Sequence, residues 1–120
     1  MTIETHQKDG MMVAEFTADE TIIRTTDDAL ELLGNHYYKG YDAMILYQNQ
    51  IIPGFFDLRT GLAGEILQKF AQYQMRLVII GAFHTVESES LRQFIEESNK
   101  GSHVHFTDSL PEALKKLEIQ

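Results

Sequence analysis

Blocks of apolar residues alternate with polar segments along the chain, and their lengths predict strands and helices in turn. Short blocks rich in β-branched and aromatic residues predict strands. These blocks lie at 11–16, 21–24, 43–47, 76–81 and 103–107. The first two flank a polar segment and therefore predict an opening hairpin. The block 76–81 is the most β-like of the five and is predicted to be the central strand.

Apolar residues at helical spacing fill the segments between and after the later strands. The first helix is predicted to begin around Thr25 to Asp28, where hydroxyls and carboxylates suit free backbone N–H groups, and to stop by Gly40. Its predicted inward residues are Ala29, Leu30, Leu33 and Tyr37. A second helix is predicted over residues 60–73, with Leu62, Ile66, Leu67, Phe70 and Tyr73 on one face.

Capping residues predict the last two helices. Ser88 or Thr85 precedes a helix that would bury Leu91, Phe94 and Ile95 and end at the 99–101 segment. Ser109 precedes a short helix with proline in its first turn. The predicted order is ββαβαβαβα, which favours a mostly parallel sheet with an N-terminal hairpin. At 120 residues, positions 1–120 are predicted to form a single α/β domain.

Composition narrows the classes of function. The formal net charge is -8 and the ten Lys and Arg residues are scattered, so nucleic acid is not expected as a partner. The apolar runs fall short of the roughly 20 residues that cross a bilayer, so no membrane association is expected. Residues 1–10 lack the features of a secretory signal, and the chain has no cysteine. These observations favour a cytoplasmic protein.

The segment 53–61 is the main candidate binding site, because it leads from a predicted strand into the start of a helix. Free N–H groups at a helix start bind anions or carboxylates, and open α/β sheets bind ligands at such turns. The candidate binding residues are Gly54, Asp57, Arg59, Thr60 and Gly61. A purely structural interpretation is that Thr60 caps the helix, Gly61 and Gly64 allow close packing, and Asp57 pairs with Arg59.

Histidines give weaker indications of a functional site than the segment 53–61 does. His84 follows the strand block 76–81, where α/β proteins often place functional groups, so it joins the candidate binding residues. No nucleophile motif accompanies it, and no catalytic residue is assigned. His103 and His105 would share one face of a strand, but two ligands do not make a metal site. No metal and no cofactor are therefore predicted.

Aromatic residues gather near the first helix and the segment 53–61. They are Tyr37, Tyr38, Tyr41, Tyr47, Phe55 and Phe56. Aromatic side chains are enriched at protein interfaces, yet they also pack around small sheets. They are interpreted here as core packing.

Four stretches carry a resemblance to a known family. FFDLRTGLAGEILQKF, RLVIIG, LRQFIEESNKG and FTDSLPEAL resemble a family of short bacterial proteins described as a domain of unknown function, DUF4180. The resemblance covers nearly the whole chain. More distantly, the order of elements and the Thr60-Gly61-Leu62 turn before an amphipathic helix resemble STAS domains, typified by anti-sigma-factor antagonists.

The STAS resemblance implies a regulatory surface in front of the second helix. In antagonist-type STAS domains this loop carries a phosphorylatable serine, whose state decides whether a kinase-like anti-sigma partner is bound. Arg59 stands at the best-matching position here, so the usual switch is not implied. Thr60, beside the glycine, is the candidate phosphoacceptor.

Two hypotheses of different classes follow. The first is a non-enzymatic regulatory or protein-interaction module that uses the 53–61 loop and the helix start. The second is a small-molecule or anion-binding protein, an enzyme included, whose site at the carboxyl ends of the parallel strands combines Asp57, Arg59, Thr60 and His84. A pocket joining Arg59 to His84 would favour the second. A homo-oligomer is compatible with either.

Overall fold

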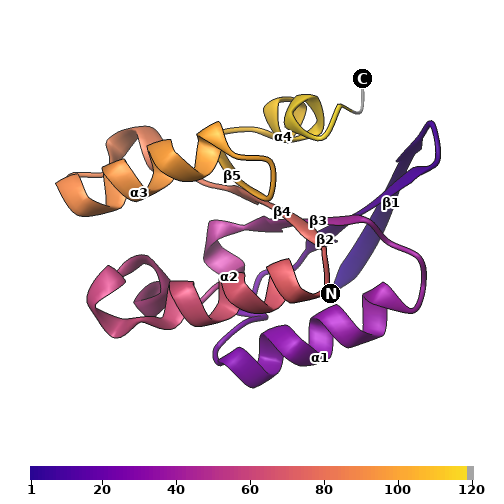
Figure 1. Cartoon of the computed structure of the whole chain (residues 1–120), viewed down its shortest axis with the longest axis horizontal. Coiled ribbons are helices and arrows are strands. Elements are labelled where there is room, and N and C mark those ends of the chain that lie inside the picture. Colours follow the sequence, from indigo (N-terminus) through magenta and orange to yellow (C-terminus); the bar gives the residue numbers. More distant parts are fainter. Residues whose placement is uncertain (119–120) are drawn as a thin grey trace.

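A five-stranded sheet organises the chain, and its strands lie in sequence order, β1-β2-β3-β4-β5. The computed structural model describes residues 1–118 (Figure 1). The strands are β1 (Thr2–Lys8), β2 (Met11–Thr17), β3 (Ala43–Tyr47), β4 (Arg76–Ile80) and β5 (Val104–Thr107). β1 and β2 pair antiparallel, whereas all later neighbours pair parallel. The predicted single α/β domain with a mostly parallel sheet is confirmed.

Four helices complete the domain: α1 (Thr26–Tyr37), α2 (Leu62–Gln72), α3 (Glu89–Lys100) and α4 (Leu110–Lys116). Three of them begin at side-chain caps, in which the hydroxyls of Thr25, Ser88 and Ser109 accept from backbone N–H groups three residues on. These caps confirm the helix starts that local sequence predicts. Among residues 1–118, no helix combines the length and apolarity needed to cross a bilayer.

The opening hairpin is displaced from its predicted position. Its first strand is 2–8 rather than 11–16, and 11–16 belongs to the second strand. Asp9 and Gly10 form the turn with φ of 52° and 85°, the backbone that an Asp-Gly hairpin turn requires. The segment 21–24 is not a strand, because Ile23 makes a single bridge to Ile51. The sequence correctly predicted an opening hairpin but placed both of its strands too late in the chain.

Two further predictions need correction. β3, not β4, is the central strand. Both strands are apolar on both faces, so composition alone does not rank them. In α1 the buried residues are Ala29, Leu32, Leu33 and His36. Helix α1 is rotated so that the His36 ring packs edge-on against Phe16, with centroids 5.0 Å apart, and Tyr37 is left 50% exposed.

Apolar side chains form a core on each face of the sheet. The larger core joins Met44 and Leu46 to buried residues of α1, α2 and α3, whereas Ala43 and Ile45 face a smaller core with α4. Figure 1 shows α1 and α2 on one side of the sheet and α4 on the other. Helix α4 is short, so most of the helical cover lies on one face.

The aromatic cluster is only partly in the core. Phe55 is 1% exposed, but Tyr38 is 87% exposed, so the prediction of core packing was wrong for Tyr37 and Tyr38. The Tyr37 ring instead contacts Tyr38 and Tyr73 edge-on, with centroids 5.6 and 5.5 Å away. These three rings therefore pack on one another and not in the core.

Candidate functional site

The 53–61 loop consists of two short 3₁₀ turns, Pro53–Phe56 and Leu58–Thr60, in front of α2. The helix therefore begins at Leu62 and not at Thr60 as predicted. Gly61 separates the last turn from the helix with φ of 75°, a left-handed backbone that favours glycine. The predicted junction between loop and helix is present, but the chain changes direction at Gly61, which the spacing of apolar residues does not indicate.

The Thr60 hydroxyl closes this loop. Its Oγ1 donates to the carbonyl oxygens of Gly54 at 2.8 Å and Asp57 at 2.9 Å, and it accepts from the N–H of Leu62 at 3.2 Å. Gly61, at the N-cap of α2, has no side chain to offer. Thr60 therefore caps the first turn of α2 from the position before the N-cap residue Gly61. This supports the structural interpretation of Thr60.

Asp57 and Arg59 form a bidentate ion pair at the tip of the loop. Arg59 Nε and Nη2 donate to the two Asp57 carboxylate oxygens at 3.0 and 2.9 Å, and the Arg59 backbone N–H donates to Asp57 Oδ1 at 3.1 Å. These hydrogen bonds lower the pKa of Asp57 and raise that of Arg59. The Arg59 side chain is 90% exposed, so the pair presents a polar, charge-compensated surface.

Glycines of this segment have different roles from those in the structural interpretation. A Cβ at Gly61 or at Gly64 would meet no atom within 4 Å. Close packing therefore explains neither residue, and that part of the interpretation was wrong. Gly61 is required by its backbone angle alone.

Two cavities border the loop. The first, here called the loop groove, has a volume of about 550 Å³ and is lined by Phe56, Asp57, Leu58, Arg59, Ser88 and Ser90. The second, here called the strand-end cavity, has a volume of about 640 Å³ and lies where β3 and β4 end. Its walls include Tyr47, Gln48, Asn49, Pro53, Phe56 and Gly81. Phe56 lines both cavities.

His84 lies apart from both cavities. It is exposed on the turn Phe83–Thr85, and its Nδ1 is 3.4 Å from Asp108 Oδ1. Neither cavity is lined by both Arg59 and His84. The structure brings Gly54, Asp57, Arg59, Thr60 and Gly61 together in one loop and leaves His84 outside it.

The two histidines near β5, predicted to share one face of a strand, lie in different surroundings. His103 precedes the strand and is exposed, whereas His105 is 4% exposed and bonds through Nε2 to the Gly101 carbonyl oxygen at 2.9 Å. Burial lowers the pKa of His105, since a charged imidazole is disfavoured there. These two residues do not form a pair of metal ligands.

A polar cluster that the sequence analysis missed lies on the opening hairpin. Glu15 is 5% exposed, and its carboxylate accepts from the Tyr47 hydroxyl at 2.6 Å and hydrogen-bonds to His6 Nε2 at 2.8 Å. One signal was available, namely an acidic residue inside the apolar block 11–16. A buried carboxylate requires partners, and partners of this kind mark candidate sites.

Comparison with known proteins places the chain in a family. A family model described as Domain of unknown function (DUF4180) matches residues 8–117. The chain belongs to this family. No curated protein matches the DUF4180 chain. A solved structure that is similar to it is the crystal structure of a “putative anti-sigma factor antagonist” from Thermotoga maritima, with 13% sequence identity and a TM-score of 0.48 over 97% of this chain and 94% of that one.

Proposed function

We propose that this DUF4180 protein is a non-enzymatic regulatory or protein-interaction module, and that its contact surface is the 53–61 loop together with the loop groove. The observation that carries the proposal is that the loop is already ordered by its own hydrogen bonds. The Thr60 hydroxyl and the Asp57–Arg59 pair hold both 3₁₀ turns without help from another chain. A pre-formed loop loses little conformational entropy when a partner binds, which favours affinity.

The chemistry of the groove favours a protein partner over a free anion. Phe56 and Leu58 are half-buried and leave apolar surface at the groove, and Arg59 is exposed beside them. Apolar contact flanked by arginine is typical of the energetically important parts of protein interfaces. An isolated anion would gain less, because Asp57 already compensates the Arg59 charge.

The start of α2 also has little capacity for an anion. The Thr60 hydroxyl accepts from the Leu62 N–H, and Glu65 lies in the first turn, where its carboxylate accepts from the Thr26 hydroxyl at 3.0 Å. A carboxylate at that position already interacts with the helix dipole. We therefore assign the loop a protein contact.

Affinity capture with loop variants tests the proposal. The tagged chain captures partners from a bacterial lysate, and quantitative mass spectrometry compares the wild type with Leu58→Ala and Arg59→Ala. Arg59 is exposed, so its removal should change the unfolding midpoint little, whereas Leu58 packs partly against the core. The midpoint of each variant is therefore measured, and capture is compared at a temperature where both variants are folded. We expect the specifically captured protein to fall at least tenfold with each variant.

A matched variant separates loss of contact from loss of positive charge. Lys115→Ala removes an exposed cation from α4, which covers the opposite face of the sheet. It should capture as much partner as the wild type. Equal capture by the wild type, Leu58→Ala and Arg59→Ala would refute the proposed surface.

Regulation by phosphorylation at Thr60 is a separable part of the proposal. A phosphate on Oγ1 would remove the proton that Thr60 donates to two carbonyl oxygens, so it would open the loop as well as add charge. Thr60→Glu adds charge and removes the hydroxyl, whereas Thr60→Val removes the hydroxyl alone. If the two variants bind a partner equally, charge at this position has no regulatory effect.

The strand-end cavity supports a second candidate function, the binding of a small molecule at the carboxyl ends of β3 and β4. Its walls combine Ile51, Phe56 and Ile80 with the amides of Gln48 and Asn49. Within residues 1–118, no Lys, Arg, Asp or Glu lines it. Such a cavity suits an uncharged, partly apolar ligand. A ligand screen by NMR should shift the Gly81 amide signal, and Asn49→Trp, which fills the cavity from its exposed rim, should abolish the shift. Binding unaffected by Asn49→Trp would remove this candidate.

A further inference from the structure

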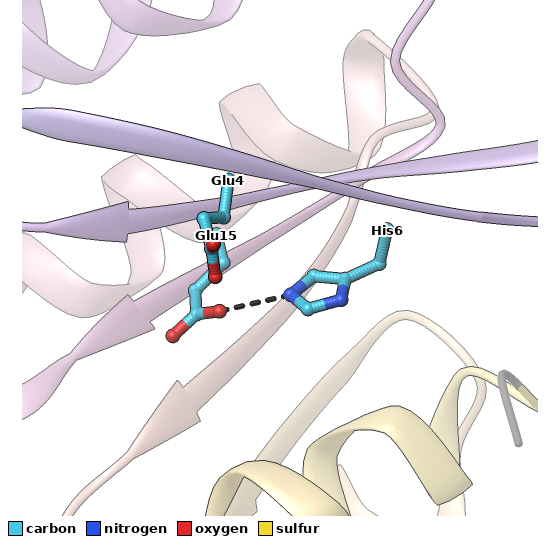
Figure 2. A group of neighbouring side chains, drawn as sticks. All are labelled: Glu4, His6 and Glu15. Carbon is cyan, nitrogen blue, oxygen red and sulfur yellow. Dashed lines mark hydrogen bonds and ion pairs between the residues drawn. The ribbon is translucent and has the colours of Figure 1, made fainter.

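Three side chains that bind metals elsewhere converge on the opening hairpin. Glu4 and His6 alternate along β1, so they share a face, and the strand register places Glu4 directly opposite Glu15. One ligand atom of each of the three residues lies within 4.8 Å of the other two. Figure 2 shows the carboxylates and the imidazole on the same side of the hairpin, with His6 reaching toward Glu15.

We propose that Glu4, His6 and Glu15 bind one divalent transition-metal ion, with Zn²⁺ and Mn²⁺ as the candidates to test. An imidazole nitrogen together with two carboxylates is a donor set that favours first-row transition metals over Ca²⁺ or Mg²⁺. With ligand distances of about 2.1 Å, neighbouring donors lie about 3.0 Å apart around an octahedral ion and about 3.4 Å apart around a tetrahedral one. The 2.8 Å between His6 Nε2 and Glu15 Oε1 is close to these values. The Glu4 carboxylate, within 4.8 Å of the other two donors, has to move closer when an ion binds.

The electrostatics of the hairpin support a cation at this place. Like charges directly opposite one another across a strand pair are destabilising, and Glu4 and Glu15 form such a pair. Glu15 is also 5% exposed, so its charge is poorly hydrated. A bound dication would replace the repulsion between the carboxylates with coordination to both.

A hydrogen bond from Tyr47 orients the buried Glu15 carboxylate. The Tyr47 hydroxyl donates to Oε2 of Glu15, which fixes the carboxylate and leaves Oε1 directed at His6. Such outer hydrogen bonds orient metal ligands in known sites.

The expected site is open to ligand exchange. Three protein donors leave at least one coordination position for water, and the His6 side chain is 22% exposed. Binding requires the lone pair of His6 Nε2, so the hydrogen bond between Nε2 and Glu15 Oε1 has to be given up, and the neutral ring then carries its proton on Nδ1. Tyr47 also lines the strand-end cavity, so a ligand there would share a wall residue with the metal site.

Titration calorimetry of the full chain after chelator treatment tests the proposal, with Zn²⁺ and Mn²⁺ added separately as chlorides near neutral pH. We expect one ion per chain. His6→Gln and Glu4→Gln should each weaken binding at least tenfold, and both residues lie on the edge strand β1, where substitution leaves the core intact. Glu15→Gln should have a larger effect, and the two β1 variants keep the test valid if that buried change unfolds the chain.

Matched histidine variants decide whether the ion binds at the proposed place. His84→Gln and His103→Gln remove exposed imidazoles elsewhere and should bind as the wild type does. Co²⁺ offers a second readout, because its visible absorption should report imidazole coordination that His6→Gln abolishes. Absence of binding below millimolar concentrations, or binding unchanged by His6→Gln and Glu4→Gln, would overturn the proposal.

Discussion

Two glycines three residues apart should respond to alanine in opposite directions. Gly61 has φ of 75°, a conformation that costs an L-residue at least about 1 kcal/mol. Gly64 lies within α2 at an ordinary helical position, where alanine is favoured over glycine by about 0.5–1 kcal/mol. Both are exposed, and a Cβ at either site would meet no atom within 4 Å, so packing does not complicate the comparison.

The expected difference is large enough to measure by thermal unfolding. An unfolding entropy of about 2.1 cal/mol/K per residue gives about 250 cal/mol/K for a chain of this length, so 1 kcal/mol shifts the midpoint by about 4 °C. Gly61→Ala should therefore lower the midpoint and Gly64→Ala should raise it, with about 6–8 °C between the two variants. Urea unfolding gives the free energies independently. If Gly61→Ala is neutral or stabilising, the loop does not reverse at Gly61 as described.

Three further predictions concern other parts of the domain. Thr60→Val should lower the free energy of unfolding by about 1–2 kcal/mol, because a hydroxyl that donates and accepts is lost, and Thr60→Ser should restore most of it. Gly81→Ala should lower the free energy of unfolding by about 1–3 kcal/mol, because the new Cβ would clash with the amide oxygen of Gln48 and lie 2.7 Å from the Gln48 Cβ. Gly54→Ala is the control, because a Cβ there would meet no atom within 4 Å. Burial lowers the pKa of His105 in the folded state, so below about pH 6.5 the unfolded chain takes up the proton first and the free energy of unfolding falls. Urea midpoints measured against pH should therefore fall less steeply on the acid side for His105→Gln than for the wild type. An equally steep fall in the variant would contradict the role given to His105.

Local signals allowed much of the fold to be predicted. The hydroxyls of Thr25, Ser88 and Ser109 indicate helix starts, because each accepts a hydrogen bond from a backbone N–H only three residues further along the chain. The parallel strands carry apolar residues on both faces, so their composition identifies them. These elements depend on contacts that are near in sequence or on burial that is nearly complete.

The missed features depend on pairing between segments. β1 is largely exposed and polar, so its strand character comes from its register with β2 and from the Asp9-Gly10 turn. The same register brings Glu4 opposite Glu15, which spacing within either strand does not reveal. The expected link between Arg59 and His84 failed for a similar reason, because two 3₁₀ turns, Pro53–Phe56 and Leu58–Thr60, reorient the chain before α2.

The sequential strand order has a consequence for how the chain acquires its structure. Since every strand pairs with the strand before it, the sheet can grow by adding one unit at a time from the tight Asp9-Gly10 hairpin onward. No strand has to wait for a distant segment to insert between two that are already paired. Each pairing closes only the segment between two successive strands, and the entropic cost of closure grows with the length of that segment, so the domain should fold rapidly for an α/β protein.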